Sequence, residues 1–432
     1  MAKNHLLPLV SYVPPAVAEA IYHNPTVPSA PSVQFFTAAV LFADVSGFTP
    51  LAEALAQKGP EGAEALTRVL NTYFSRMITL IERRAGEVVK FSGDAMMVVF
   101  PAPAGQMGDA VRRAQEAAEA MQGAMDEFSR LETIAGPVEL GMKIGIGVGQ
   151  VSAFSVGGEQ DKWEYVIAGD PLRQVAEAEH SAERGEIILS PEAKGALSAY
   201  PSSGYRSVAI DWEMLSENQI KAAEVALRAY IPEIITSRLA AGQSGWLAEL
   251  RRLTVLFVSV VQGLDYAQSN AIDRLQAFTH AAQTTILRYE GSINKIAVDD
   301  KGTILIGLFG APPFAHEDDP ERALRCALDL QGAARAQGLR LAIGVTTGQV
   351  FSGPVGSDTR REYTVMGDIV NLAARLMSVA VKALRQEERE NQFRDENGIR
   401  CDDETYQAAA GRLTFHQLSP VYVKGKARLI QL

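Results

Sequence analysis

Apolar residues in the first half of the chain follow two spacings, one typical of strands and one of helices. A continuous apolar run at 36–45 predicts a buried strand, and apolar positions three and four residues apart over 51–84 predict a helix. Two short apolar runs within 86–100, separated by Ser-Gly-Asp, are typical of a β-hairpin. The elements predicted next are a helix at 110–131, strands at 138–148, 150–155 and 162–168, a helix from Pro171 and a strand at 187–189. This order predicts an α+β fold, an antiparallel-rich sheet covered by helices on one face.

The same order of elements returns in the second half of the chain. GQVSAFSVGG at 149–158 resembles GQVFSGPVGS at 348–357, with an offset of 348 − 149 = 199, and EYVIAGD at 164–170 resembles EYTVMGD at 362–368, with an offset of 198. A drifting offset indicates loop insertions within a repeated fold. The repeat predicts a first domain at 35–200, an ordered linker at 201–250 and a second domain at 251–432. The preceding residues 1–34, rich in Pro and Ala, are predicted to form an N-terminal strap.

Composition narrows the classes of function. A net charge of −10 argues against nucleic acid as a partner, and 47% hydrophobic residues over 432 positions are enough for two large cores. The two cysteines, Cys326 and Cys401, form no metal-binding or disulfide pattern, which is typical of a reducing cytoplasm. No apolar run approaches the roughly 18 residues that a membrane span needs, so no span is predicted.

Two segments place a carboxylate where it is held rigidly. In FADVSGFTP, Asp44 ends the strand at 36–45 and the following residues open a helix, while in VVKFSGDAMMVVF the residues Lys90 and Asp94 flank a tight turn. A carboxylate on such a turn can bind a metal ion. Taken alone, each aspartate is also explained by ordinary turn chemistry.

These segments together resemble a known family. FADVSGFT, KFSGD, GIGVGQV and EYTVMGDIVNLAARLM, at their spacing, are similar to the class III nucleotidyl cyclases, and the tandem arrangement over about residues 35–430 is most similar to the soluble adenylyl cyclases. The resemblance implies two ferredoxin-like catalytic domains packed as a pseudo-symmetric heterodimer within one chain. It further implies conversion of ATP into 3′,5′-cyclic AMP and pyrophosphate at a composite site, with two Mg²⁺ ions for which Mn²⁺ can substitute.

The resemblance implies a role for each residue of one complete site. The metal ligands would be Asp44, Asp94 and the Val45 carbonyl; the phosphate contacts would be the backbone amides of Ser46, Gly47, Phe48 and Thr49 with the side chain of Lys143; and the second half would supply Lys295 and Thr364 for adenine, Asn371 for ribose and Arg375 for the transition state. Lysine and threonine match the hydrogen-bonding edge of adenine better than that of guanine, which favours ATP over GTP.

The mirror-image site is degenerate by the same alignment. Its replacements are Ser259 for Asp44, Ala342 for Lys143, Val166 for Thr364, Arg173 for Asn371 and Glu177 for Arg375. In the resembling soluble cyclases this pocket binds bicarbonate through a lysine, here Lys90, and an arginine whose position here is Ala176. One hypothesis is that Arg173 takes over as the partner of Lys90 for bicarbonate or another small anion. The alternative, which we favour, is that Arg173 pairs with Glu177.

Three other interpretations remain at this stage. They are a catalytically silent module that senses ATP, a guanylyl cyclase, and an interaction module of a longer protein with further C-terminal domains. The intact set of Asp44, Asp94, Asn371 and Arg375 argues against the first.

Overall fold

The chain forms two compact units. The computed structural model describes residues 6–103, 106–199, 210–242, 249–299, 302–390, 398–418 and 420. The first unit consists of Met1–Glu249 together with Ser352–Thr364, and the second of Leu250–Phe351 together with Val365–Leu432. One division therefore falls at the end of the predicted linker. The transfer of Ser352–Thr364 to the first unit was not anticipated from the sequence pattern.

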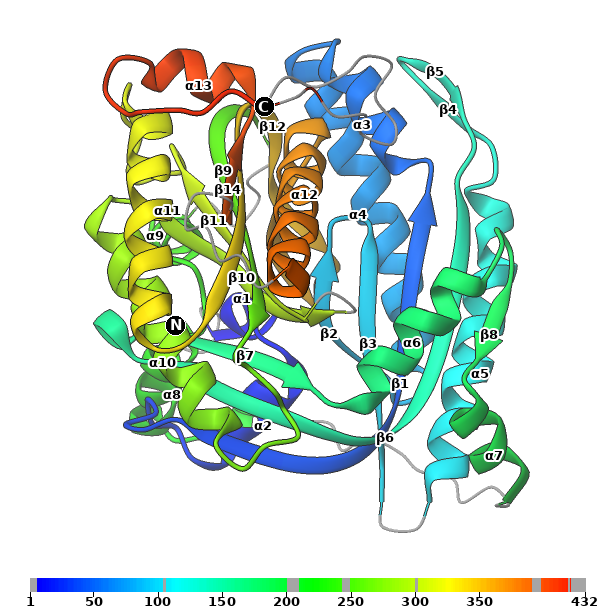
Figure 1. Ribbon diagram of the computed structural model, residues 1–432. Helices are drawn as coiled ribbons and strands as arrows, with labels where there is room; N and C mark the ends of the chain where they lie inside the picture. The colour runs from blue at the N-terminus through cyan, green and yellow to red at the C-terminus, as the bar shows by residue number, and fades with distance from the viewer. Residues whose placement is uncertain are drawn as a thin grey trace. The chain divides into compact units, whose positions relative to one another are not determined.

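The first unit is built on a six-stranded sheet (Figure 1). Its strands, in spatial order, are β2 (Glu87–Ser92), β3 (Ala95–Ala102), β1 (Ser32–Ser46), β6 (Gly141–Gly157) and β7 (Trp163–Ala168), with β8 (Ile187–Leu189) paired to β6. All pairings are antiparallel except β6 with β8. Strand β1 lies in the middle of the sheet, and this position explains its continuous apolar run, because residues 38–41 are completely buried.

Five of the described α-helices lie between these strands in the chain or directly after the last of them. They are α3 (Phe48–Ala56), α4 (Pro60–Glu82), α5 (Met107–Ala124), α6 (Asp170–Ser181) and α7 (Pro191–Ala199). Helix α5 packs on β1, α6 packs on β6, and α5 contacts both α4 and α7. Helix α6 thereby brings its polar side chains close to the end of β1, where the predicted metal ligand lies.

Three boundaries differ from the sequence prediction. The helix predicted at 51–84 is two helices, because Gly59 adopts a φ of +66° and Pro60 starts a new helix where its missing N–H costs nothing. The helix predicted to reach residue 131 ends at Ala124, and a small hairpin of β4 (Leu131–Thr133) and β5 (Gly136–Val138) follows. The two strands predicted at 138–155 are the single strand β6, whose register with β1 runs through Gly149 without a shift.

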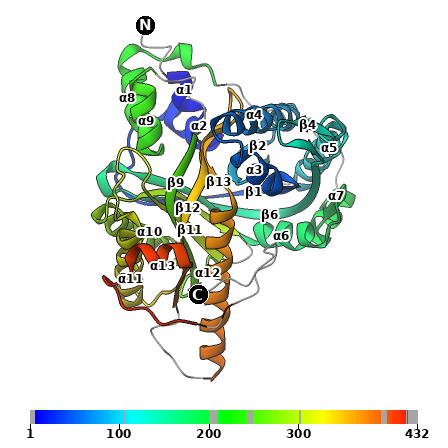
Figure 2. The same cartoon turned by 90° about the horizontal axis from the view of Figure 1, so that it is seen from above.

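The second unit repeats the first sheet strand for strand. The order is β10 (Ser292–Asp299), β11 (Gly302–Phe309), β9 (Glu249–Gln262), β12 (Arg340–Gly356) and β13 (Arg361–Met366), with β14 (Ile399–Cys401) parallel to β12. Its helices are α10 (Ala271–Arg288), α11 (Asp319–Ala336), α12 (Asp368–Glu390) and α13 (Asp403–Ala409), and α10 and α11 lie side by side (Figure 2). The predicted α+β class and the repeat of one sheet-and-helix unit are confirmed.

The N-terminal segment packs with the linker inside the first unit. Helices α1 (Leu6–Val10) and α2 (Pro15–His23) both contact α8 (Glu217–Ala229) (Figure 2). The rings of Tyr22 and Trp212 meet edge to face, with 5.5 Å between centroids. A second linker helix, α9 (Glu233–Ala240), follows. Within the linker, residues 201–209 and 243–248 lie outside the described residues.

Among the described residues, no helix combines the length and the apolar character needed to cross a membrane.

Candidate functional site

Asp44 lies near the end of the central strand β1, beside Lys143 on β6. The two residues are paired across the antiparallel ladder, and Lys143 Nζ lies 4.0 Å from Asp44 Oδ2. The same ammonium is 2.5 Å from Glu179 Oε1 on helix α6. Strand pairing and the packing of α6 on the sheet thus gather two carboxylates around one lysine. The predicted phosphate-binding Lys143 is held in place by these contacts.

Asp94 lies in the two-residue turn of the hairpin formed by β2 and β3. Ser92 and Ala95 close the turn, and Gly93 adopts a φ of +67°, a conformation that favours glycine. One residue before Lys90, the register of β2 shifts, so that Val89 is an extra residue in the ladder. The bulge and the tight turn together fix the direction of both predicted site residues on this hairpin.

Asp44 and Asp94 are near enough for the charge of Asp44 to affect the ionisation of Asp94. Burial and the charge of Asp44 raise the pKa of Asp94 to about 7. Burial and the charge of Glu179 raise the pKa of Asp44, against the opposing effect of Lys143. Each carboxylate is therefore poorly compensated as an anion, which is the condition that a divalent cation relieves.

Tyr73 on α4 is close enough to these carboxylates to be affected by their charges. Its side chain is completely buried and its hydroxyl has no hydrogen-bond partner in the described part of the chain. Burial, followed by the charges of Asp94 and Asp44, raises the pKa of this phenol. Its ring meets that of Phe48 edge to face, with 5.4 Å between centroids. Tyr73 thus packs against the first residue of α3, a role for which the sequence carried no signal.

The segment predicted to bind phosphate turns sharply from β1 into α3. Gly47 adopts a φ of +104° at the N-terminus of α3, and a Cβ atom there would lie 2.6 Å from the carbonyl oxygen of Glu139. The hydroxyl of Ser46 donates to the carbonyl of Gly141 at 3.1 Å, and Phe48 is buried. Thr49 follows in the first turn of α3. The turn needs glycine at position 47, and it leads directly into a helix N-terminus, the arrangement that favours an anion.

The remaining predicted residues belong to the second repeat. Lys295 on β10 is 4% exposed and follows a bulge like the one before Lys90, because the register of β10 shifts between Ile293 and Lys295. Asn371 and Arg375 lie four residues apart on α12, so they share one face of the helix. Thr364 is 1% exposed on β13 and is the last residue of the segment that belongs to the first unit.

Ser259, Asp299 and Arg173 occupy mirror positions of the repeat, and Asp299 corresponds to Asp94 as Lys295 corresponds to Lys90. Strand pairing places Ser259 on β9 opposite Ile304, and its buried hydroxyl has no partner among the described residues. Asp299 is exposed and pairs with Gly302 at the end of the second hairpin. The guanidinium of Arg173 pairs with Asp170 at 2.8 Å and with Glu177 at 2.7 Å. The pairing with Glu177 is the one that the alternative interpretation of Arg173 predicted.

The residues at the end of β1 and in the hairpin turn fit a hard divalent cation. Asp44 and Asp94 supply carboxylate oxygens, which are the ligands that Mg²⁺ and Mn²⁺ prefer. In the described part of the chain, no group of three or more His, Cys, Asp or Glu side chains is arranged to hold a metal. Two carboxylates leave coordination positions for a backbone carbonyl, water and phosphate, as Mg²⁺ sites usually do. The buried hydroxyl of Tyr73, which has no hydrogen-bond partner among the described residues, has its pKa raised by the charges of the same two carboxylates as well as by burial.

Metal affinity at these carboxylates is expected to rise as the pH rises from about 6 to about 8. The pKa of Asp94 in the folded chain, about 7, is above the unfolded value, so protonation stabilises the fold. That contribution is fully present at low pH and is lost as the pH rises through about 7. Without metal, the melting temperature should fall by a few degrees over this range, and Mn²⁺ should oppose the fall because it binds the carboxylate form.

Thermal melts in EDTA and in Mn²⁺ measure this effect. Glu87 also has a pKa raised to about 7, by burial and by the charge of Glu19, so the comparison with Asp94→Asn isolates the contribution of Asp94. The variant should show a smaller pH dependence in EDTA and little response to Mn²⁺. Equal pH profiles for both proteins would show that Asp94 does not titrate as described.

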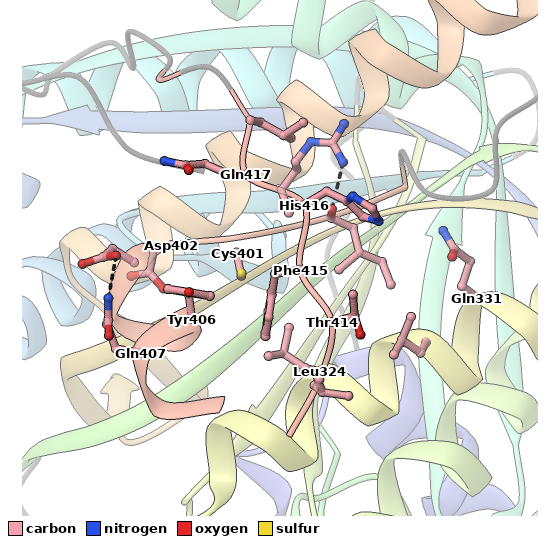
Figure 3. A pocket seen from close by; sticks show the side chains of 16 residues that line it. Leu324, Gln331, Cys401, Asp402, Tyr406, Gln407, Thr414, Phe415, His416 and Gln417 are labelled. Carbon is pink, nitrogen blue, oxygen red and sulfur yellow. Dashed lines mark hydrogen bonds between the residues drawn. The ribbon is translucent and has the colours of Figure 1, made fainter. Parts of the chain in front are cut away.

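A large pocket lies elsewhere in the second unit (Figure 3). It has a volume of about 720 Å³ and is lined by residues of α11, β14, α13 and the segment 413–418. The rings of Tyr406 and Phe415 meet edge to face in its wall, with 5.0 Å between centroids. None of the predicted site residues lines it. The pocket is therefore not the site that the sequence pointed to.

Comparisons with known proteins agree with the family resemblance and with the fold. A family model described as the adenylate and guanylate cyclase catalytic domain matches residues 31–227 and 261–431. Adenylate cyclase type 10 of Mus musculus is 27% identical over 408 residues, 83% of this chain, and that of Homo sapiens is 27% identical over 395 residues, 81% of this chain. The chain spans 25% and 24% of the lengths of these two relatives.

A solved structure has the same fold as this chain. The crystal structure of a class III adenylyl cyclase-like ATP-binding protein from Pseudomonas aeruginosa superposes with a TM-score of 0.59. The alignment covers 87% of this chain and 85% of that chain, at 15% sequence identity. At this identity the likeness concerns the fold alone.

Proposed function

Because this chain belongs to the family of adenylate and guanylate cyclase catalytic domains, we propose that it converts ATP into 3′,5′-cyclic AMP and pyrophosphate. The observation that carries the proposal is the pair of carboxylates, Asp44 and Asp94, whose pKa values are raised by burial and by neighbouring negative charge. Adenylate cyclase type 10 is the name of the relatives that match most of the chain.

In the proposed mechanism, residues of both repeats act on one nucleotide. Asp44 and Asp94 would hold two divalent cations, whose positive charge would lower the pKa of the ribose 3′-hydroxyl and neutralise the triphosphate. The amides at the N-terminus of α3 and the ammonium of Lys143 bind phosphate oxygens. Glu179 orients Lys143 through the 2.5 Å contact.

The second repeat supplies base recognition and stabilises developing charge. Lys295 donates to N1 of adenine, and the hydroxyl of Thr364 accepts from the 6-amino group. Asn371 holds the ribose, and Arg375 neutralises the negative charge that builds up on the α-phosphate as the 3′-oxygen attacks it. No covalent intermediate with the protein is needed, so positioning and electrostatic stabilisation supply the rate enhancement.

The choice of ATP over GTP follows from the two base-recognition side chains. Guanine carries a donor at N1 and an acceptor at position 6, so the ammonium of Lys295 would meet the N1 donor. Incubation of the protein with Mn²⁺ and either ATP or GTP, followed by quantification of the cyclic nucleotides, tests the proposal. We expect cyclic AMP, with at least about tenfold less cyclic GMP. Binding of ATP without cyclisation would favour a silent sensor, and a preference for GTP would favour a guanylyl cyclase.

The degenerate site is proposed to be unresponsive to bicarbonate. An anion bound beside Lys90 would need a second cation, and the guanidinium of Arg173 is already paired with Asp170 and Glu177. At fixed pH and ionic strength, added bicarbonate should therefore change the rate of cyclic AMP formation by less than about twofold. Sodium chloride at the same concentration is the control. A larger, saturable stimulation would restore the hypothesis that Lys90 and Arg173 bind a regulatory anion.

We place this activity in the cytoplasm. Both cysteines, Cys326 and Cys401, are free thiols, as is usual in a reducing compartment.

A further inference from the structure

The segment Ser352–Thr364, which we call the strap, joins two strands of the second repeat but belongs to the first unit. Its contacts with α4 are polar: Asn71 Oδ1 accepts from the amide of Gly356 at 3.3 Å, and Thr359 donates to Glu82 at 2.7 Å. Closer to β13, the amide of Arg361 donates to the carbonyl of Ser11 at 2.6 Å. The strap is therefore fixed to the rest of the first unit at Gly356, Thr359 and Arg361.

Arg360 is a buried charged side chain of the strap. It is 3% exposed, and its Nε and Nη2 atoms donate to the carbonyls of Val88 at 2.9 Å and Val89 at 2.8 Å. Its guanidinium lies over the ring of Phe91, 5.4 Å from the centroid. Glu362 completes the cluster, because its Oε2 accepts from the amide of Phe91 at 3.2 Å and lies 3.4 Å from Nη2 of Arg360.

These contacts lie on the bulge of β2. The register of this strand shifts between Val88 and Lys90, so Val89 has no place in the ladder with β3. A bulge sets the direction of the residues that follow it. Lys90 comes directly after this bulge, and Asp94 lies at the turn four residues further on. The guanidinium of Arg360 thus holds the backbone at the point from which the metal-binding turn is directed.

The equivalent residue of the first repeat does something else. With the offset of 362 − 164 = 198 between the two EY motifs, Arg360 corresponds to Lys162. Lys162 donates to the carbonyls of Arg228 at 3.0 Å, in the last turn of α8, and of Ile231 at 3.1 Å, just beyond that helix. Arg360 therefore binds the backbone of the hairpin that carries Asp94, whereas its counterpart Lys162 binds the backbone of the linker.

We propose that Arg360 is a positioning residue for metal binding, which holds the bulge of β2 so that Asp94 faces the metal site. The inference deepens the proposed function and rests on it. The strap also ends at Thr364, four residues beyond Arg360, so one rigid segment sets the base-recognition threonine and the hairpin of the metal ligand together. Arg360 does not touch substrate or metal in this account. It acts through the backbone of Val88 and Val89.

The test compares Arg360→Met, which keeps the length of the side chain, with Arg360→Lys, which keeps the charge but loses the fork that reaches two carbonyls. Mn²⁺ binding is measured by electron paramagnetic resonance of the free ion, in the presence of a non-cyclisable ATP analogue. Arg360→Met should weaken Mn²⁺ binding by about tenfold, and the Mn²⁺ concentration for half-maximal cyclase rate should rise by the same factor. The Mn²⁺ affinity of Arg360→Lys should lie between that of Arg360→Met and that of the wild type.

The matched control is Arg76→Met on α4, which removes an arginine whose side chain is 40% exposed and paired with Glu127. It should leave Mn²⁺ binding unchanged. A purely structural role for Arg360 would lower the melting temperature and the amount of active protein, with the Mn²⁺ affinity of the folded fraction unchanged, and that result would overturn the inference. If the wild type itself forms no cyclic AMP, the proposed function fails, whereas the Mn²⁺ binding comparison still decides the role of Arg360.

Discussion

Replacement of Asp44 by asparagine is expected to lower the rate of cyclic AMP formation by about a thousandfold or more. The substitution keeps the size of the side chain and removes the negative charge that binds the cations. Because Asp44 is paired in the ladder with Lys143, the loss also leaves Lys143 with Glu179 as its remaining carboxylate partner. The rate constant kcat, measured at saturating ATP and Mn²⁺, is the quantity that should fall.

The matched control for Asp44→Asn lies at the equivalent position of the other repeat. Ser259 occupies that position, and its buried hydroxyl has no partner in the described part of the chain, so Ser259→Ala removes no hydrogen bond there. This control should keep the wild-type rate within about twofold. A substantial residual rate in Asp44→Asn, or an equal loss in Ser259→Ala, would contradict the assignment of the catalytic site to the first carboxylate pair.

Removal of the guanidinium by Arg375→Ala is expected to lower kcat by about a hundredfold to a thousandfold. The proposed role is to neutralise charge that develops only in the transition state, so kcat and kcat/KM should fall together while KM for ATP changes little. Steady-state kinetics over a range of ATP concentrations separate the two constants. Among the described residues, the Arg375 side chain makes no hydrogen bond or ion pair, so truncating this side chain should cost little stability.

Lys382 provides the control on the same helix. It is exposed on α12, seven residues beyond Arg375, and Lys382→Ala changes the charge of the helix by the same amount. This variant should retain wild-type kinetics. An increase in KM alone for Arg375→Ala would assign the arginine to substrate binding, and an unchanged rate would remove it from the site.

Much of the fold follows from local pattern. The strand at 36–45, the hairpin at 86–100 and the repeated strand order all depend on the spacing of apolar residues within short windows, which the chain carries explicitly. The helix break at Gly59 and Pro60 was also readable, because proline starts helices and glycine adopts a positive φ there. The apolar spacing continues across this break, and the helix prediction followed that spacing.

The contacts that complete the site do not follow from local pattern. Glu179 reaches Lys143 only because α6 packs on β6, and the sequence held no indication of that pairing. Arg360 reaches Val88 across 272 positions of the chain, and in the sequence it is one of two arginines before an EY motif. A backbone carbonyl that accepts from a buried arginine changes neither the composition nor the hydrophobic periodicity of the sequence. These residues became visible only with the folded chain.

In the proposed account, one fold retains a site in one copy and has lost it in the other. Both lysines, Lys90 and Lys295, follow a bulge at the same place in the sheet, so the backbone has kept its shape. The side chains have diverged: the first carboxylate is a buried serine in the second copy, and the second hairpin extends further before it turns. Conservation of the backbone with loss of ligands is consistent with one working site in the chain.

A crystal structure of the chain with Mn²⁺ and a non-cyclisable ATP analogue tests the central claim most directly. Anomalous scattering would locate the Mn²⁺ ions, and the density of the analogue would show which side chains surround its base and phosphates. The account predicts Mn²⁺ on Asp44 and Asp94, with adenine against Lys295 and Thr364 of the same chain. Mn²⁺ bound away from Asp44 and Asp94, or a nucleotide that contacts residues of one repeat only, would contradict it.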